Sequence, residues 1–560
     1  MDVEVNNFQS ELPRILEAIA NSRVVSIDLE LSGIPGRQSG QARTSGRSED
    51  GRQTLQERYE ENKIAAERYQ ILQLGLTCVE EDLKLGVYTT RTYNFLMNPV
   101  TDKRLGVERD FTFQSGAVEF LMSVNFQMEA PLKKGVPYFS RQEEAQARSI
   151  ATARQDKSSI EDLHVPIDDT DTVNFVQRVR EETNEWVKKW RFQGTSATTF
   201  LNIAPLNYGS PKYNGRGLNG FQKRLVHQLI RAEFPDVVSI SKPEFIQLIP
   251  YDKDREDAQS QKKVAWFDRS LTSQIGLRWV AEALCPNVHR VLPAELTAPN
   301  ASGDLAAIAN GGWIYPLSPI PELKKNLIAS KFEKTLHKLK AKRTILVGHN
   351  LFIDLIYFFT CFFGPLPDRV EEFQSLVGQL FPLVFDTKYL ADKINNNSPY
   401  YRSSLEDIDR ELSKLLVPVI EIPPEHNKYD FGSPVHEAGF DSFLTARVLI
   451  RLSTKTEAER NSGADAPDAE SEASLSASED GGVVLTAEQL KRVTLHPSGK
   501  AGPYTFSDSN PFAALREQGL QDVPPHTMMP HEHSPFWLQY GNKLRVNGTI
   551  EGACIIPIIR

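Results

Sequence analysis

The feature that most constrains this chain is an apolar run from Val24 to Ile34 that holds two acids one residue apart, Asp28 and Glu30. In a β-strand, side chains at positions i and i+2 point to the same face, so these carboxylates stand side by side. Burying adjacent carboxylates is costly unless cations neutralise them. The pattern predicts either a site for a hard divalent cation, which prefers oxygen ligands, or an edge strand with a wet, acidic face.

Composition indicates a soluble intracellular protein. The formal net charge of -9 excludes a uniformly basic nucleic-acid coat, although local basic patches remain compatible with it. The four cysteines lie far apart without a C-x-x-C pair, which argues against a zinc ribbon and a disulfide framework. The first residues lack a signal-peptide pattern, and the longest apolar run, Leu355 to Phe363, is too short to span a membrane. We therefore expect no membrane partner.

The order of periodic segments predicts an α/β fold. After the acidic strand, strand-like runs at 71–79 and 90–97 suggest an antiparallel meander. The β-branched run Thr344 to Val347 is typical of a buried parallel strand. The other expected helices cover 7–21, 55–68, 116–124, 173–190, 221–234, 277–284, 323–339, 351–363, 404–415 and 438–452. A further strand is expected at 239–250, a strand or a strand-helix junction at 383–390, and strand-like alternation over 537–559.

A further acid follows the parallel strand. Asp354 opens the next helix and is the only charged residue between Asn350 and Asp368. The helix dipole favours an acid in a first turn, so a structural explanation exists. A lone carboxylate in so apolar a segment nevertheless needs a partner, and a cation is a natural one.

The segment VHEAGFD contains His436 and Asp441 and opens an apolar helix. Positions i and i+5 lie about 140° apart on a helix, so these side chains converge only if His436 precedes it. Gly432-Ser433-Pro434 just upstream is typical of such a loop. Taken alone, His436 fits a surface or cap residue better than a catalyst.

Three motifs follow one another along the chain: the Asp-x-Glu strand, the Asp that opens a helix and the His-x4-Asp motif. Their order resembles the histidine branch of the DEDD superfamily of 3′-to-5′ exonucleases. The flanking blocks resemble the poly(A)-specific ribonuclease family over most of residues 1–450. These blocks are LELSGI, ERYQILQLGL, GVPYFSRQEE, NGFQKRLVHQLI, LVGHNLFIDLIYFF, FDTKYLA and VHEAGFDSFLTARVL. Because no RNA-recognition motif is apparent after Gly482, the resemblance is to a fungal-type member without that module.

The resemblance implies an α/β fold, namely a ribonuclease-H-like mixed sheet flanked by helices, with an inserted small α+β single-strand-binding-like domain. The implied parts are an exonuclease domain at 1–165 and 264–452, an inserted Arg-x-x-x-His-type nucleic-acid-binding-like domain at 168–263, a disordered acidic linker at 453–482 and a C-terminal segment at 483–560 that we expect to return to the exonuclease domain.

The resemblance also implies the chemistry, which is two-metal hydrolysis of single-stranded RNA 3′ tails, poly(A) above all, to 5′-mononucleotides. Two Mg²⁺ ions, with Mn²⁺ as a substitute, would lie roughly 3.5–4 Å apart. Their implied ligands are Asp28, Glu30, Asp354 and Asp441. His436 is the implied general base that takes the proton of the attacking water.

Substrate contacts are less specific in the sequence. His349 and Asn350 fit contacts to the phosphate or terminal sugar, although Asn350 equally fits a helix cap. Ile34 fits a wedge against the terminal base or, more simply, core packing. Lys388 fits a phosphate contact or an ion pair with Asp386.

In the inserted segment, the Arg-x-x-x-His motif is degenerate, with Lys223 in the Arg position and His227 in the His position. Together with Arg224 they form a basic helix face that suits phosphate contact or is simply solvated. Three further expectations come from the resemblance alone or stay open. They are a homodimer, a location in the nucleus and/or cytoplasm, and, as alternative functions, a 3′ trimmer of small or non-coding RNA precursors, a DNA-proofreading enzyme or a non-catalytic RNA-binding protein.

Overall fold

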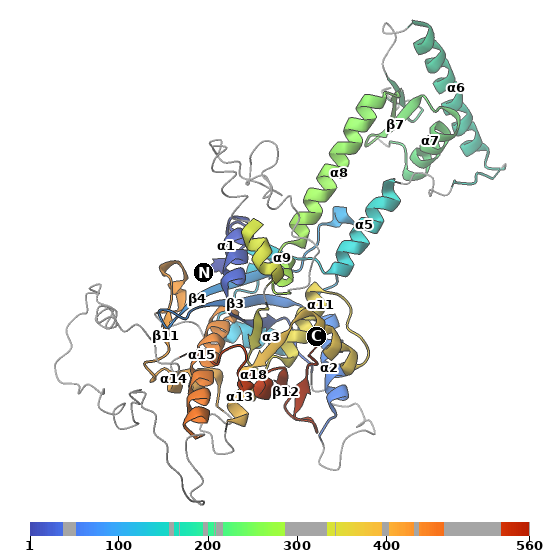
Figure 1. Cartoon of the computed structure of the whole chain (residues 1–560). Coiled ribbons are helices and arrows are strands. Elements are labelled where there is room, and N and C mark those ends of the chain that lie inside the picture. Colours follow the sequence, from blue (N-terminus) through green and yellow to red (C-terminus); the bar gives the residue numbers. More distant parts are fainter. Residues whose placement is uncertain are drawn as a thin grey trace, which may run out of the picture.

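A mixed sheet forms the centre of the main body (Figure 1). The computed structural model describes residues 1–36, 52–155, 162–166, 168–193, 200–206, 208, 217–285, 333–341, 343–394, 403–430, 436–463 and 528–558. The strands run in the order β1 (Asp2–Val3), β4 (Val87–Asn98), β3 (Ile71–Asp82), β2 (Val24–Leu31), β9 (Ile345–Gly348) and β10 (Leu383–Asp386), while β5 (Val136–Pro137) and β11 (Val419–Glu421) also pair with β4.

Strand directions agree with the sequence-based expectation. β2, β3 and β4 form an antiparallel meander, and β9 and β10 join it parallel to β2. The carboxyl end of β9 therefore lies at the same edge as the carboxyl end of β2, which holds Asp28 and Glu30. In the ladder between β2 and β3, Asp28 is directly opposite Gly75.

Alternating residues of β2 pack into two apolar clusters on opposite faces of the sheet. Val25, Ile27 and Leu29 belong to the first cluster, whereas Val24 belongs to the second. The first cluster includes residues from α1 (Phe8–Asn21), α2 (Leu55–Arg68), α9 (Arg278–Ala283), α11 (Phe352–Phe362) and α12 (Val370–Leu380). The second includes residues from α13 (Thr387–Lys393), α14 (Leu405–Leu412), α15 (Ala438–Gly463) and α18 (Pro535–Tyr540).

Short elements complete the body. They are η1 (Lys103–Leu105), α3 (Ser115–Ser123), α4 (Ala130–Lys134), η5 (Pro424–Tyr429) and a helix over 333–341. Within the described ranges, no helix is both long enough and apolar enough to cross a membrane.

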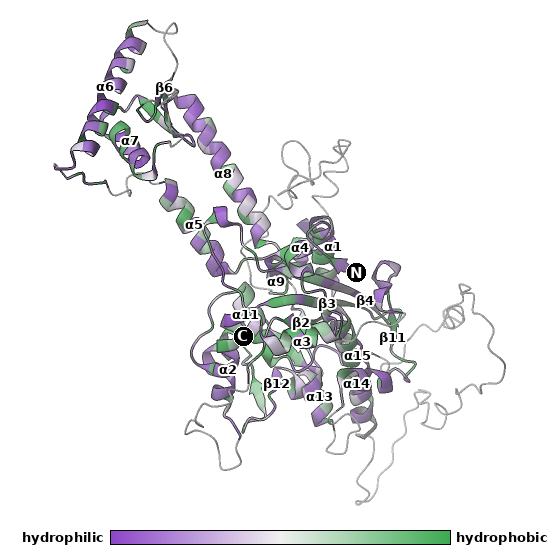
Figure 2. Ribbon diagram, turned by 180° about the vertical axis from the view of Figure 1, so that it is seen from behind, coloured by the Kyte–Doolittle hydropathy of each residue, from purple (hydrophilic) through white to green (hydrophobic). Residues whose placement is uncertain are grey.

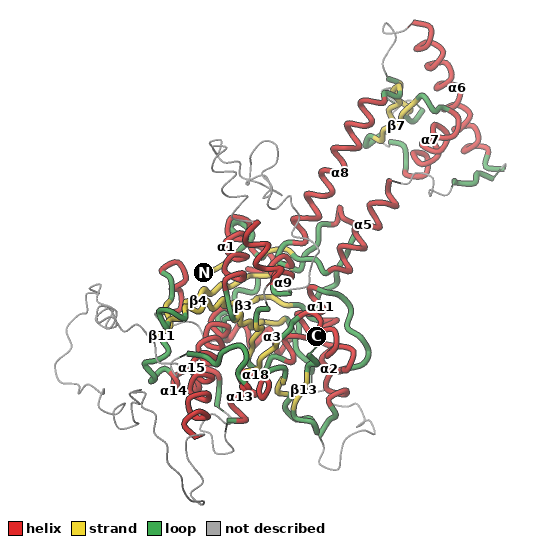
Figure 3. Tube along the Cα trace, in the orientation of Figure 1, coloured by secondary structure: helices red, strands yellow, loops and turns green. Residues whose placement is uncertain are grey.

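Two long helices, α5 (Arg141–Gln155) and α8 (Lys253–Ile275), lead from the body to a separate small unit (Figures 1 and 3). Figure 2 shows hydrophilic residues along much of α8, in keeping with a helix surrounded by solvent. The unit has its own apolar core, built from a sheet of β6 (Leu201–Ile203), β8 (Ile246–Pro250) and β7 (Val237–Ser241) together with α6 (Thr170–Gln193) and α7 (Gly220–Glu233).

Three expectations need correction. The single strand expected at 239–250 is a hairpin, β7–β8, because the backbone N–H of Lys242 donates to the carbonyl of Phe245 and turns the chain. α8 continues without a break across residue 263, where we expected the insertion to end. α15 continues to Gly463, so the expected linker begins as helix, and residues 464–482 lie outside the described part.

The described C-terminal residues, 528–558, pack on the edge of the main sheet. They contain α18 and the pair β12 (Lys543–Arg545) and β13 (Ala553–Ile555), so the alternation expected over 537–559 is helix first and strand afterwards. The rings of Phe536 and Trp537 contact Phe385 of β10, at 5.7 and 5.5 Å between centroids. Asn542 forms two hydrogen bonds with the Val384 backbone, of 2.7 and 2.8 Å.

Candidate active site

Asp28 and Glu30 lie on the face of β2 that α15 covers. Ser26, two residues before Asp28, is buried on this face, and its hydroxyl donates to the carbonyl of Ser442 in α15 at 2.6 Å. Since strand side chains alternate, Asp28 and Glu30 point the same way. The sequence-based inference that the two acids share a face is therefore consistent with the structure.

Polar side chains of the sheet hold the first turn of α15. The backbone N–H of Ala438 donates to the Gln73 side-chain oxygen at 3.0 Å, and that of Gly439 donates to the Asn94 side-chain oxygen at 3.1 Å. These bonds satisfy N–H groups that a helix start leaves without an intrahelical partner. Asp441 follows in the same turn and is held beside β2.

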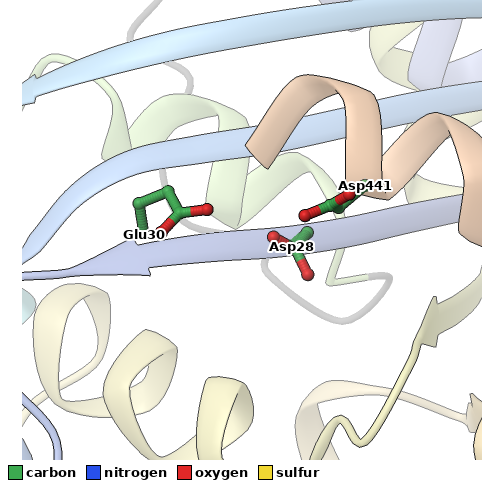
Figure 4. A group of neighbouring side chains, drawn as sticks. All are labelled: Asp28, Glu30 and Asp441. Carbon is green, nitrogen blue, oxygen red and sulfur yellow. The ribbon is translucent and has the colours of Figure 1, made fainter. Parts of the chain in front are cut away.

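The acids from β2 and α15 form a carboxylate cluster (Figure 4). Asp28, Glu30 and Asp441 each offer a carboxylate oxygen, and these oxygens lie within 4.8 Å of one another. Glu30 is 8% exposed, and the other two side chains are partly buried. Three acidic oxygen donors so close together match the preference of Mg²⁺ and Mn²⁺ for hard oxygen ligands.

The fourth predicted ligand, Asp354, lies in the first turn of α11, directly after β9. Its charge raises the pKa values of both Asp28 and Glu30, although burial and Asp441 contribute more to each shift. Burial, followed by the charge of Asp386, raises the pKa of Asp354 to about 8. Asp354 thus acts electrostatically on the cluster.

The surroundings of these acids disfavour their ionised forms. Burial and the neighbouring carboxylates raise the pKa of Asp28 well above its ordinary value and that of Glu30 to about 8. Burial, with Glu406 and Glu437, raises the pKa of Asp441 to about 7. At neutral pH such a group of acids either retains protons or is neutralised by cations, and the donor set fits divalent metal.

His436 lies just before α15, at the helix mouth where convergence with Asp441 requires it. Its φ is 65°, its side chain is exposed, and its ring contacts Phe120 of α3 edge-on at 4.9 Å between centroids. Among the described residues it forms no hydrogen bond with the carboxylate cluster. The structure therefore places His436 near the start of the same helix as Asp441 without joining the two side chains.

Asp386 organises the loop between β9 and α11. Its carboxylate accepts hydrogen bonds from the backbone N–H groups of Asn350 and Leu351, at 3.0 and 3.3 Å. It also caps α13 and accepts from the backbone N–H of Arg545 at 2.9 Å. Asp386 thus links β10, the loop that leads to Asp354, and the C-terminal segment.

The two loop residues predicted to contact substrate have defined surroundings. Nδ1 of His349 is 2.9 Å from the Thr387 hydroxyl, and burial, Lys388 and Arg545 lower the His349 pKa to about 3, so its ring is neutral. Asn350 has φ 60° and an exposed side chain. The alternative role of Asn350 as helix cap is wrong, because its amide oxygen accepts instead from Arg545 at 3.3 Å.

Lys388 is buried, and its ammonium donates to the Ser403 carbonyl at 2.8 Å and lies 3.7 Å from Asp392. Asp386, the alternative partner, accepts from the backbone N–H of Lys388 rather than pairing with its side chain. For Ile34, the core-packing alternative is wrong, because the residue is 52% exposed.

In α7 the predicted motif residues stabilise the small unit itself. Lys223 donates to the carbonyls of Lys242 and Pro243, both at 2.7 Å. The ring nitrogens of His227 lie 2.7 and 2.9 Å from the hydroxyls of Ser239 and Ser241. These contacts join α7 to the β7–β8 hairpin, whereas Arg224 is exposed.

Sequence reasoning missed Gly75, Gln73, Asn94 and Arg545. The first three lie in the β3–β4 part of the meander. No local pattern there marks a residue as a contact of α15, which lies more than 300 positions later in the chain. Asp386 has a weak signal in the sequence, because it follows the apolar run Leu383–Phe385, but the sequence indicates for it only an ion pair with Lys388.

Comparison with known proteins places these observations in a family. The chain is 22% identical over 471 residues to poly(A)-specific ribonuclease PARN of Xenopus laevis, covering 81% of this chain and 62% of that protein. It is 23% identical over 464 residues to a pre-piRNA 3′-exonuclease trimmer of Bombyx mori, covering 81% and 71%. The chain spans about six tenths of the length of the first curated relatives it matches.

Among solved structures, Pop2p of Schizosaccharomyces pombe in an Mg²⁺- and Mn²⁺-bound form aligns with a TM-score of 0.31 and 13% identity, covering 80% of this chain and 89% of that one. The family model for CAF1 family ribonucleases matches residues 3–449, from β1 into the first half of α15. This match confirms the resemblance inferred from the sequence blocks. The chain belongs to the CAF1 ribonuclease family.

Proposed function

We propose that the protein is a divalent-metal-dependent 3′-to-5′ exoribonuclease that removes single-stranded 3′ tails, with poly(A) as substrate. The observation that carries the proposal is the carboxylate cluster of Asp28, Glu30 and Asp441, whose oxygens lie within 4.8 Å of one another. Membership of the CAF1 ribonuclease family and similarity to a poly(A)-specific ribonuclease support the reaction class. The mixed sheet, with a meander followed by parallel strands, supports a ribonuclease-H-like fold.

The cluster, together with Asp354, would hold Mg²⁺ or Mn²⁺. When bound, the metal supplies an activated water and charge stabilisation at the scissile phosphate and the departing 3′ oxygen. The protein's own contribution is to fix these acids on three rigid elements, β2, α11 and α15. Burial is the largest cause of the raised pKa values of these acids, and neighbouring carboxylates add to it. The ionised site is therefore unfavourable when it is empty, and a bound cation stabilises it.

His436 takes the role of general base, accepting the proton of the attacking water. Its exposure and its place just before the helix that holds Asp441 support this role, since a general base must come within hydrogen-bonding reach of the attacking water. Ile34 contacts the terminal base, and Asn350 and His349 contact the terminal nucleotide. Both Ile34 and Asn350 expose their side chains, as substrate contacts require.

The small unit on α5 and α8 contributes RNA binding through the exposed face of α7, with Arg224 as its cation. Lys223 and His227 act by holding α7 on its hairpin. We further propose a homodimer, by similarity to the resembled family. If light scattering gives the mass of a single chain, the homodimer is contradicted, whereas the proposed exoribonuclease reaction is not.

The test of the reaction is release of AMP from 3′-end-labelled oligo(A) in Mg²⁺, in Mn²⁺ and in EDTA. We expect metal-dependent, stepwise shortening from the 3′ end and a loss of at least about 10³-fold in Asp28→Asn. The matched control is Asp368→Asn, which changes the same group at a side chain that is 98% exposed and should leave the rate unchanged. Equal activity of Asp28→Asn and the parent protein would refute the proposal.

A second candidate function is 3′ trimming of small RNA precursors. The chain is 23% identical to the Bombyx mori trimmer, which is as high as its 22% identity to PARN of Xenopus laevis. Rates on oligo(A), mixed-sequence RNA and DNA separate the candidates. A trimmer shortens mixed RNA as fast as oligo(A), whereas a poly(A)-specific enzyme prefers oligo(A). RNA binding without shortening of any substrate would identify a non-catalytic RNA-binding protein.

A further inference from the structure

The C-terminal segment lies outside the region that the family model matches, yet it is built into the catalytic body. The match ends at residue 449, whereas β12 covers Lys543–Arg545. Asn542 pairs with the backbone of β10, and the backbone N–H of Arg545 donates to Asp386 at 2.9 Å. Asp386 also holds the loop with Asn350, so β12 is joined to that loop through a single carboxylate.

The side chain of Arg545 reaches the same loop. Its Nε pairs with Asp392, and one terminal nitrogen donates to the amide oxygen of Asn350 at 3.3 Å. The other terminal nitrogen makes no hydrogen bond to any residue in the described ranges. The side chain is 20% exposed, so part of the guanidinium faces solvent beside Asn350.

A cation at this position offsets the negative charge of the surrounding acids. The carboxylate cluster lies on this part of the body, and so do Asp354 and Asp392. Their negative charges repel the phosphates of any RNA that approaches. Among the described residues, Lys388 is the other cation that acts on this loop, but it is only 5% exposed and its ammonium contacts Ser403 and Asp392. Both cations also act on His349 and lower its pKa, after the larger effect of burial. Arg545 is therefore the cation of this pair that retains an accessible donor.

We propose that Arg545 binds a backbone phosphate of the RNA substrate beside Asn350, so that the C-terminal segment completes the substrate site of the catalytic domain. This inference rests on the proposed exoribonuclease function. The ion pair with Asp392 and the bond to Asn350 hold the planar guanidinium in place, and its remaining N–H groups suit a phosphate oxygen.

The test uses the full chain with Arg545→Gln, Arg545→Lys and, as control, Lys543→Gln. Lys543 lies two residues away on the same strand, and its ammonium donates to the carbonyl of Gln539 rather than to the loop. Steady-state kinetics on oligo(A) are measured at several salt concentrations. For Arg545→Gln we expect KM to rise by about tenfold or more with a much smaller change in kcat.

The salt dependence of RNA affinity distinguishes a phosphate contact from a structural role of Arg545, because a structural role does not change it. Losing one phosphate contact to a single strand reduces the slope of log affinity against log salt by about 0.7. We expect that reduction in Arg545→Gln, partial recovery of KM in Arg545→Lys, and an unchanged slope in Lys543→Gln. An unchanged KM and slope in Arg545→Gln overturns the proposal, as does an equal change in the control, which would indicate a general field effect.

Binding measured without turnover separates this inference from the proposed reaction. Fluorescence anisotropy with labelled oligo(A) is recorded for Asp28→Asn and for the double variant with Arg545→Gln. Weaker binding by the double variant supports the phosphate contact even if the parent protein shortens no RNA. Equal binding contradicts it. Thermal unfolding of Arg545→Gln completes the test, since weakened RNA binding with an unchanged Tm excludes a loss of folding.

Discussion

A Cβ atom placed on Gly75 would lie 1.8 Å from the carbonyl oxygen of Ala438. Gly75 is directly opposite Asp28 in the sheet, and Ala438 begins α15, which holds Asp441 in its first turn. The absent side chain at position 75 lets the start of α15 rest on the backbone of β3. This contact sets how closely Asp441 approaches Asp28.

Gly75→Ala should therefore displace α15 and open the carboxylate cluster. Overlap with backbone atoms cannot be relieved by a side-chain rotation, so we expect a stability loss of about 1–3 kcal/mol and weaker Mg²⁺ binding. Calorimetric titration with Mg²⁺ and thermal unfolding measure the two effects. Gly116→Ala in α3 is the matched control, because a Cβ there meets nothing within 4 Å. Normal Mg²⁺ affinity in Gly75→Ala would contradict this account.

The stability of the metal-free protein should fall as pH rises. The folded-state pKa is about 8 for Glu30 and Asp354 and about 7 for Asp441, whereas unfolded carboxyls titrate near 4. Between these values the folded state binds more protons than the unfolded state. The contribution of these groups is thus fully present below about pH 4 and is lost as pH rises toward 8.

Thermal unfolding in EDTA across this pH range measures the effect, and addition of Mg²⁺ should restore Tm most at the alkaline end. Glu30→Gln removes a carboxyl whose pKa is about 8, so in EDTA at and above pH 8 it should raise Tm, by about 2–4 °C for each kcal/mol gained, while abolishing activity. A lower Tm for Glu30→Gln under these conditions would show that ionisation of this acid does not destabilise the metal-free protein.

Asp386→Asn should destabilise the body although Asp386 is not among the proposed metal ligands. Its carboxylate accepts backbone hydrogen bonds from Asn350, Leu351 and Arg545, and an amide offers only one acceptor atom. We expect a loss of about 2–3 kcal/mol, together with reduced activity because the loop before Asp354 loosens. Denaturant unfolding measures the change, and Asp368→Asn at an exposed site should alter it by less than about 0.5 kcal/mol.

Ile34→Ala should change substrate affinity without changing stability. Ile34 is 52% exposed, so its removal leaves no cavity in the core. If its side chain contacts the terminal base, KM for oligo(A) should rise about 5- to 20-fold with an unchanged Tm. Ile64→Ala, at a residue that is 64% exposed on α2, is the control. An equal KM in both variants would remove Ile34 from the substrate site.

Several features of this protein follow from its sequence alone. Strand periodicity put Asp28 and Glu30 on one face, and the length and composition of the run at 344–347 predicted a buried parallel strand. The ordered motifs around Asp354, His436 and Asp441 were specific enough to indicate the family that the comparison confirms. These inferences succeeded because they rest on local spacing or on the order of short motifs.

Other features were decided by the tertiary structure. The approach of Asp441 to Asp28 depends on the missing side chain at Gly75. The exposure of Ile34 depends on how the loop after β2 leaves the sheet. The place of Arg545 depends on hydrogen bonds between Asn542 and Val384 of β10, which are 158 residues apart in the chain. Burial and contact arise between residues far apart in the chain, so no local periodicity encodes them. The sequence by itself determined which acids are available and in what order, and only the folded chain decided how close they come and which distant side chains support them.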